Sequence, residues 1–323
     1  MRKVFLSALL VFALASVVSA EPVPSKVITI EPEVHEIGFW ENVPFAEGVA
    51  RGSLRYTLYM DVFQPKVKEK CPLIVFVTGG GFIMAPRNNL PQIRMRLAEA
   101  GYVVASIEYR VAPLGKFPQP LEDVKTAIRW LRAHADKFNI DPERVGVLGN
   151  SAGGYLSAFT GITNGDKTFD KGEYLDYSSD VLCAVDMYGL SDLTVVGADY
   201  SQEIQDQHKS AGATEALWVI GALPFGGKDG GVLAPENKEL VDYANPINHI
   251  SEKSAPMLLM HGSADPLVSP SQTDLIFQAL QAKGIESERY IVTGAGHGGV
   301  YWCHEPVMKV IVDFYDKYLK KGL

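Results

Sequence analysis

A single serine stands in the segment GVLGNSAGG (residues 146–154), with small residues around it and an apolar run before it. Its central five residues, GNSAG at 149–153, fit the pattern G-x-S-x-G. Between a strand and a helix, this pattern places the serine on a sharp, strained turn that exposes the hydroxyl at the edge of a sheet. The two glycines allow the strand and the helix to approach closely. Ser151 is therefore the candidate nucleophile.

A serine nucleophile needs a base, and the base needs a group that orients it. Downstream, Asp265 lies in HGSADPLV and His297 lies in GAGHGG, each directly after a predicted strand. Loops that follow parallel strands meet at one edge of the sheet, so both side chains are expected beside Ser151. Asp265 could instead be a simple turn acid before a proline, and His297 a loop histidine without a role. His261 directly follows a strand and is expected to support the loop.

Acyl transfer also needs donors for the negative charge that develops on the carbonyl oxygen. The segment VTGGGF (77–82) follows the apolar run PLIVFV, and its glycines leave backbone N–H groups free to point into a cavity. Gly80 and Gly81 are the expected donors. The N–H of Ala152, directly after the candidate nucleophile, is the expected third donor. A flexible glycine loop without a role is the alternative.

The elements that must position these residues alternate along the chain. Strands are predicted at 55–63, 72–77, 102–109, 145–148, 181–188, 257–260 and 288–292. Helices are predicted at 94–100, 121–138, from 151 onward, 272–283 and 307–319. This order predicts the α/β class, with a mostly parallel sheet covered by helices on both faces. Residues 21–50 are expected to be a surface leader and 141–144 a turn.

A break in this alternation covers residues 194–250, which hold glycine, proline, acidic residues and scattered aromatics. Only 215–222 has a helical pattern. We expect a cap or lid inserted above the sheet, at the edge where loops build specificity. The aromatic candidates for a substrate pocket, each of which has a core position as its alternative, are Phe82, Trp218, Phe225, Tyr301 and Trp302. Glu305, near the candidate base, is expected to be a solvated helix acid.

The first twenty residues have the composition of a secretory signal. A basic start, Met1-Arg2-Lys3, precedes an apolar run and the small residues Val18-Ser19-Ala20. The run is too short for a comfortable membrane span, and a buried N-terminal helix is the alternative. Removal of residues 1–20 changes the formal charge from −8 to about −10. We expect a secreted or periplasmic protein with one catalytic domain over 21–323, and no nucleic-acid or membrane partner.

The three cysteines fit no zinc or redox motif. They are Cys71, Cys183 and Cys303. An oxidising compartment permits a disulfide, and the odd count leaves at least one thiol free. Cys183 lies in an apolar run and is expected to be a small core residue. No metal and no organic cofactor is implied.

Together, the motifs resemble the α/β-hydrolase fold, in the esterase branch that carries an H-G-G-G loop and is similar to hormone-sensitive lipase. The resemblance covers about residues 55–320, and its pieces are T-G-G-G-F, Y-R-x-A-P, F-P-x-P-L-x-D, G-N-S-A-G-G, H-G-x-x-D-P-L-V and G-x-G-H-G. Among relatives, the chain resembles secreted bacterial feruloyl and acetyl xylan esterases. Thr78 stands where the family has a histidine that holds the glycine loop. Thr78 can hydrogen-bond locally, so we expect the oxyanion hole to persist.

The expected function is hydrolysis of a small-molecule or polysaccharide-linked ester through an acyl-enzyme. Ser151 attacks the carbonyl, His297 takes its proton and Asp265 holds the imidazole. Activity is expected to rise through the histidine range, near pH ~6.5. A peptidase of the prolyl-oligopeptidase type uses the same residue order, but 323 residues leave no room for its propeller domain. A catalytically silent carbohydrate- or ligand-binding protein and a lipid-active esterase are two further hypotheses.

Overall fold

The computed structural model describes residues 25–31, 35–51, 54–113, 115–221 and 231–320. The chain divides into two units, Met1–Glu33 and Val34–Leu323. In the first unit, the described residues 25–31 are exposed and have no regular secondary structure. The predicted signal segment, residues 1–20, lies outside the described residues. All of the structure below belongs to the second unit.

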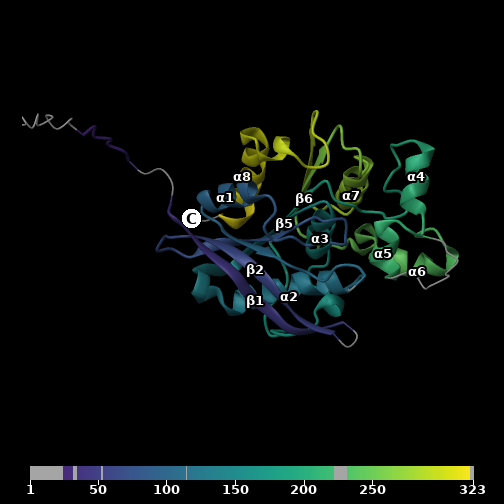
Figure 1. The fold of residues 1–323 in the computed structure, drawn as a ribbon, viewed down its shortest axis with the longest axis horizontal. Helices are drawn as coiled ribbons and strands as arrows, with labels where there is room; N and C mark the ends of the chain where they lie inside the picture. Colours follow the sequence, from purple (N-terminus) through teal and green to yellow (C-terminus); the bar gives the residue numbers. More distant parts are fainter. Residues whose placement is uncertain (1–24, 32–34, 52–53, 114, 222–230, 321–323) are drawn as a thin grey trace, which may run out of the picture. The chain divides into compact units, whose positions relative to one another are not determined.

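One eight-stranded sheet runs through this unit in the order β1-β2-β4-β3-β5-β6-β7-β8 (Figure 1). The strands are β1 (Ile37–Arg51), β2 (Leu54–Pro65), β3 (Cys71–Val77), β4 (Val103–Ile107), β5 (Ile140–Asn150), β6 (Cys183–Met187), β7 (Met257–Gly262) and β8 (Ser287–Val292). The β1/β2 and β2/β4 pairs are antiparallel, and every pairing from β4 through β8 is parallel. The predicted α/β class with a mostly parallel sheet is confirmed.

Helices cover both faces of the sheet. They are α1 (Pro91–Glu99), α2 (Gln119–Ala133), α3 (Ala152–Ile162), α4 (Gln202–Lys209), α5 (Thr214–Ile220), α6 (Lys238–Ala244), α7 (Ser271–Ala282) and α8 (Glu305–Leu319). Short 3-10 turns are η1 (Ala135–Phe138), η2 (Lys167–Phe169), η3 (Pro235–Asn237), η4 (Pro246–His249) and η5 (Val300–Cys303). Where the sequence predicts one helix over 121–138, the structure ends α2 at Ala133 and continues as η1.

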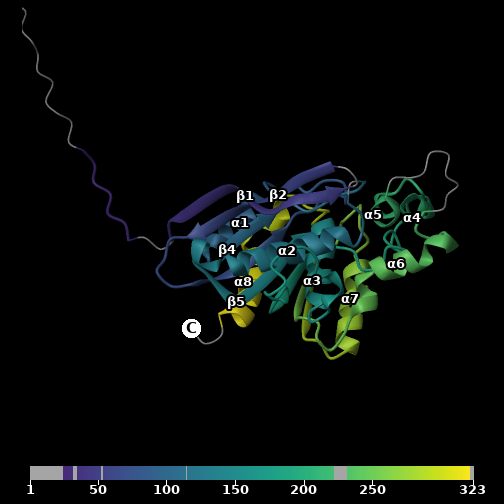
Figure 2. The same ribbon diagram turned by 90° about the horizontal axis from the view of Figure 1, so that it is seen from below.

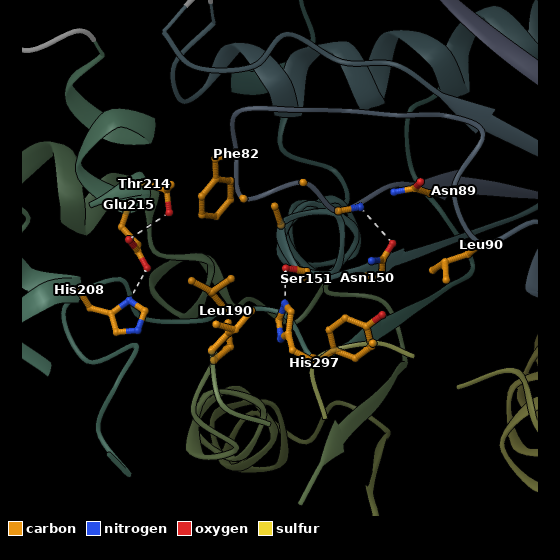
Figure 3. A pocket seen from close by; sticks show the side chains of 18 residues that line it. Phe82, Asn89, Leu90, Asn150, Ser151, Leu190, His208, Thr214, Glu215 and His297 are labelled. Atoms are coloured by element: carbon orange, nitrogen blue, oxygen red, sulfur yellow. Dashed lines mark hydrogen bonds and ion pairs between the residues drawn. The ribbon is translucent and has the colours of Figure 1, made fainter. Parts of the chain in front are cut away.

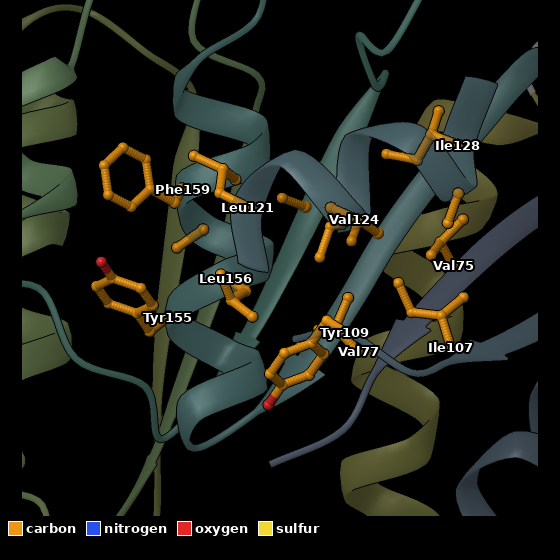
Figure 4. Packing of buried hydrophobic residues seen from close by; sticks show 14 of the residues in the cluster. Val75, Val77, Ile107, Tyr109, Leu121, Val124, Ile128, Tyr155, Leu156 and Phe159 are labelled. Carbon is orange, nitrogen blue, oxygen red and sulfur yellow. The ribbon is translucent and has the colours of Figure 1, made fainter. Parts of the chain in front are cut away.

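Strand β3 shows why the central strands read as unbroken apolar runs. Alternate side chains point to opposite faces of a strand, and both faces of this sheet are buried. Leu73, Val75 and Val77 belong to the core on the α2 and α3 face, which Figure 4 shows from close by. Ile74 and Phe76 belong to the core beneath α1 and α8. Each of these five side chains is fully buried, so the sheet is a rigid platform for the loops at its edge.

The expectation of a surface leader over 21–50 is wrong for its second half, because residues 37–51 form β1 (Figure 2). Three register shifts interrupt its pairing with β2, and Asn42 and Gly48 have positive φ angles of 54° and 61°. These bulges break the apolar–polar alternation that would have predicted a strand. Pro44 is tolerated because β1 lies at the edge of the sheet.

The expected turn at residues 141–144 lies inside β5 instead. Cys71 of β3 pairs with Ile140, and Leu73, two residues later, pairs with Val145. The extra residues on β5 therefore form an irregularity within the strand, which a local turn signal cannot distinguish from a true end.

The segment 194–250 carries α4, α5 and α6, which gather at one end of the second unit (Figure 2). The predicted helix at 215–222 corresponds to α5, Thr214–Ile220. Residues 222–230, with Phe225, lie outside the described residues. Among the described residues, no helix is long and apolar enough to cross a membrane. Cys71, Cys183 and Cys303 are all free thiols.

Strand β6 contains a buried aspartate, Asp186, that forms no ion pair among the described residues. Asp186 is 1% exposed, and its Oδ1 accepts a hydrogen bond from the Gly189 N–H at 2.8 Å. Its Oδ2 has no hydrogen-bond partner among the described residues. Burial raises the pKa of Asp186 to about 7, and the Gly189 bond offsets this only in part.

Asp186→Asn is expected to stabilise the protein in a pH-dependent manner. Because the pKa is raised from 3.8 in the folded chain, the wild type loses stability relative to the variant as pH rises from about 4 to about 7. The substituted amide would keep an acceptor oxygen for Gly189 and carry no charge. The free energy of unfolding should rise by about 3–4 kcal/mol at pH 8 and by little at pH 4. Urea unfolding at the two pH values measures this, and an equal change at both would contradict it.

Candidate active site

Ser151 occupies a tight turn between β5 and α3, with φ 55° and ψ −124°. This backbone conformation is costly for a residue with a side chain and indicates a constrained site. A Cβ on Gly149 would lie 2.0 Å from the Gly153 carbonyl oxygen, and a Cβ on Gly153 would lie 2.0 Å from the Val77 oxygen. Both glycines are therefore required for the close packing of β3, β5 and α3 around the turn.

Three side chains from three strand ends form one hydrogen-bonded row. His297, in the loop after β8, places its Nε2 2.7 Å from the Ser151 Oγ (Figure 3). Its Nδ1 lies 2.7 Å from Oδ2 of Asp265, in the loop after β7. The residue pairs are 146 and 32 positions apart in sequence, so the parallel sheet alone brings them together. The structure thus joins the three residues that the sequence singled out.

Asp265 is buried, and both of its carboxylate oxygens accept hydrogen bonds. Its Oδ1 accepts from the N–H groups of Leu267 and Val268, at 2.9 and 3.1 Å. Burial alone would raise the pKa of this carboxyl group, but hydrogen bonds from His261 and His297 outweigh it and hold the pKa well below its usual range. Asp265 is therefore a permanent negative charge beside the imidazole.

His261 and Trp302 hold the two loops rather than line the site. His261 is fully buried, and its Nε2 lies 2.9 Å from the Val268 carbonyl oxygen. Trp302 is fully buried in the core, and its Nε1 donates to the Gly296 carbonyl at 3.2 Å. The Tyr188 ring packs edge-on against His297, with 4.8 Å between centroids. The imidazole is thus fixed by packing as well as by hydrogen bonds.

The glycine loop after β3 presents its backbone to the same pocket. Gly80, Gly81 and Ala152 line it together with Ser151 and His297. The N–H groups of Gly80 and Gly81 have no acceptor in the described part of the chain. Ala152 is the first residue of α3, where the helix itself provides no acceptor. Three backbone residues with free N–H donors therefore line the same pocket as Ser151, and an oxyanion hole needs such donors.

Thr78 does not hold this loop with its side chain. Its hydroxyl is buried and has no hydrogen-bond partner among the residues that the structure describes, so the expected local bond is not formed. The loop is instead fixed through its backbone. Gly79 N–H donates to Asn150 Oδ1 at 3.0 Å, and the Tyr109 hydroxyl donates to the Thr78 carbonyl at 2.7 Å.

The active-site pocket has a volume of about 560 Å³ and extends to both sides of Ser151 (Figure 3). Of the predicted aromatic residues, only Phe82 lines it within the described part of the chain. Trp218 is fully buried and packs against Phe82, with 4.3 Å between ring centroids and 30° between the ring planes. Tyr301 is exposed and lies outside the lining. Glu305 is exposed and pairs with Arg96, as expected of a solvated acid.

Several lining residues were not predicted from the sequence. They are Asn89, Leu90, Tyr188, Leu190, His208, Thr214, Glu215, Leu267 and Val268. Tyr188 directly follows the end of β6, which pairs with β5, the strand that precedes Ser151. That position in the sequence could have identified Tyr188 as a lining residue. His208, Thr214 and Glu215 had no such signal, because only the packing of α4 and α5 brings them to the pocket.

The sheet topology and the serine turn between β5 and α3 define an α/β-hydrolase fold. The chain belongs to the BD-FAE family, which it matches over residues 60–280. It is 30% identical to the esterase LipC of Mycobacterium tuberculosis over 243 residues, which are 74% of this chain and 56% of LipC. The chain spans about half the length of the curated relatives that it matches.

Two solved structures are similar over nearly the whole chain. A truncated carbohydrate esterase from gut microbiota has a TM-score of 0.76 and 27% identity, with 90% of this chain and 99% of that chain covered. An acetyl ester-xyloside bifunctional hydrolase from Caldicellulosiruptor lactoaceticus has a TM-score of 0.66 and 26% identity, with 86% and 96% covered.

Proposed function

We propose that this protein hydrolyses carboxylic esters through an acyl-enzyme on Ser151. The observation that carries the proposal is the continuous row from Ser151 Oγ through His297 to Asp265, with 2.7 Å at both steps. A serine hydroxyl at this distance from a fixed imidazole can transfer its proton as it attacks a carbonyl carbon.

Each group has a defined task in the proposed reaction. The Ser151 Oγ bonds to the ester carbon while its proton passes to His297 Nε2, and Asp265 stabilises the imidazolium. The carbonyl oxygen becomes an oxyanion that accepts from Gly80, Gly81 and Ala152 N–H groups. Collapse expels the alcohol, which takes the proton from His297. Water then releases the acid by the same sequence of steps.

We further propose that the natural substrates are esters linked to plant polysaccharides, with acetyl or feruloyl groups. The similarity to a carbohydrate esterase and to an acetyl ester-xyloside hydrolase supports this substrate class. The pocket also combines apolar walls with a few hydrogen-bonding side chains, as expected for a small organic group with polar ends.

Initial rates on an acetyl ester, methyl ferulate and a long-chain acyl ester test this proposal. Turnover of acetyl or feruloyl substrates well above that of the long-chain ester is expected, since the polar side chains in the lining, His208, Thr214 and Glu215, disfavour a long alkyl chain. Fast turnover of the long-chain ester alone would point to a lipid-active esterase. No turnover of any of the three would reject ester hydrolysis.

We also propose that the chain is exported, on the basis of the basic start and apolar run in residues 1–20. Expression of the full chain in a bacterial host should give a mature protein that begins at Glu21. The intact mass of the protein outside the cytoplasm checks this, and a mass that retains residues 1–20 would contradict it.

A further inference from the structure

An acid–base pair, of a buried glutamate and a half-buried histidine, lines the active-site pocket on the side of α4 and α5. His208 of α4 and Glu215 of α5 are joined by a hydrogen bond of 2.8 Å between Nδ1 and Oε1. The Thr214 hydroxyl lies 3.3 Å from the other carboxylate oxygen. Glu215 is only 4% exposed. Figure 3 shows these three side chains grouped on one side of Ser151, opposite Asn89 and Leu90.

A second cavity, of about 290 Å³, lies against the same pair. His208, Thr214, Glu215 and Leu267 line both this cavity and the active-site pocket. The two spaces therefore adjoin along these four residues, which we call the shared wall. Gln207 also lines the second cavity, so its lining offers an amide side chain in addition to the wall.

The path from Ser151 to this wall is apolar, whereas the wall itself is polar. Phe82 and Leu190 stand between Ser151 and the pair in Figure 3, and Val268 also lines the pocket. The hydrogen bond to Glu215 raises the pKa of His208 against the opposing effect of burial, which favours a charged pair. An alkyl group pressed against such a pair would desolvate it without compensation, whereas a hydroxyl group can hydrogen-bond to it.

We propose that the His208–Glu215 pair and the cavity behind it form a subsite for the sugar portion of a carbohydrate ester. The inference rests on the proposed ester hydrolysis at Ser151. In an acetyl ester of a sugar, all of the hydroxyl groups belong to the alcohol, so the alcohol enters the cap side of the pocket. The small acyl group then lies on the side of Asn89 and Leu90. The second cavity, close to the ~300 Å³ of small-ligand sites, takes the continuing glycosyl chain.

Two variants, one in the pair and one at the neighbouring Thr214, test this subsite against a matched control. Glu215→Gln keeps the volume and removes the charge, and Thr214→Val removes one hydroxyl at constant shape. Asp242→Asn is the control, because Asp242 is a cap carboxylate paired with Lys238 on α6 and lines neither cavity. The probes are acetylated xylotriose and 4-nitrophenyl acetate, and melting temperatures confirm folding.

Glu215→Gln should lower kcat/KM for acetylated xylotriose about tenfold more than for 4-nitrophenyl acetate, chiefly through KM. Thr214→Val should lower the same kcat/KM by a smaller factor. Asp242→Asn should leave the ratio of kcat/KM for the two substrates unchanged. Equal losses of kcat/KM on both substrates, or no loss on either, would overturn the subsite. The pair would then only hold α4 and α5 together.

A further pair of substrates tests whether the acyl group of the ester, rather than the alcohol, contacts Glu215. If Glu215→Gln instead discriminates methyl p-coumarate from methyl cinnamate, which differ by one phenolic hydroxyl, the cap side takes the acyl group and the sugar subsite is rejected. Failure of ester hydrolysis itself is recognised separately, because the wild type would then hydrolyse none of these substrates.

Discussion

Replacement of Ser151 by alanine is expected to lower kcat for an ester substrate on the order of 10⁶-fold. The variant keeps His297, Asp265 and the three backbone donors but has no atom that can bond to the carbonyl carbon. The residual rate should come from substrate binding and oxyanion stabilisation alone. Single-turnover and steady-state rates on 4-nitrophenyl acetate measure the loss. A Ser151→Ala enzyme that keeps a substantial part of the activity would reject Ser151 as the nucleophile.

A second substitution at the same position separates chemistry from backbone strain. Ser151 has φ 55° and ψ −124°, a conformation that glycine adopts more readily than alanine or serine. Ser151→Gly should therefore be as inactive as Ser151→Ala and more stable than it by about 1 kcal/mol. Melting temperatures of the two inactive variants provide the comparison. Equal melting temperatures for the two variants would show that the backbone at position 151 is not strained.

Asp265→Asn is expected to lower kcat about 10⁴-fold with little change in the fold. The substituted amide would keep an acceptor for the N–H groups of Leu267 and Val268. Its nitrogen would face His297 Nδ1, however, and so favour the tautomer whose Nε2 carries a proton and cannot accept one from Ser151. Loss of the negative charge also removes the stabilisation of the imidazolium that forms during attack. Steady-state rates on 4-nitrophenyl acetate measure the effect.

Asp199→Asn is the matched control for this prediction. Asp199 is a loop carboxylate near the same strand end, and it accepts from the Ser271 N–H at 3.0 Å without touching His297. Its substitution should change kcat less than about threefold, as expected for a surface hydrogen bond. Comparable losses for the two variants would mean that Asp265 acts through loop stability rather than through the imidazole.

The catalytic candidates were predictable because each one lies in a short local pattern at the end of a predicted strand. GNSAG, HGSADPLV and GAGHGG each follow a predicted strand, and the carboxyl ends of parallel strands meet at one edge of the sheet. The rule needs no knowledge of side-chain packing. Ser151, Asp265 and His297 therefore emerged from the sequence as a group, together with the glycine donors.

The edge strand β1 and the aromatic residues that line the pocket were less predictable from the sequence. Bulges at Asn42 and Gly48 removed the alternation that marks β1 as a strand. Among the aromatic residues, Trp218 and Trp302 were candidates for the pocket because of their type and position. Their burial against Phe82 and behind the His297 loop depends on contacts with distant residues, and no local pattern encodes such contacts.

The sequence by itself determined the α/β class, the order of strands and helices along most of the chain, the nucleophile turn and the residues beside it, because these depend on local periodicity and on fixed turn geometry. Only the tertiary structure decided what the pocket can recognise. Tyr188 reaches His297 from another strand end, and His208 meets Glu215 only through the packing of α4 against α5. Specificity resides in such long-range contacts, since side chains from separate elements must converge before a pocket has a shape or a charge.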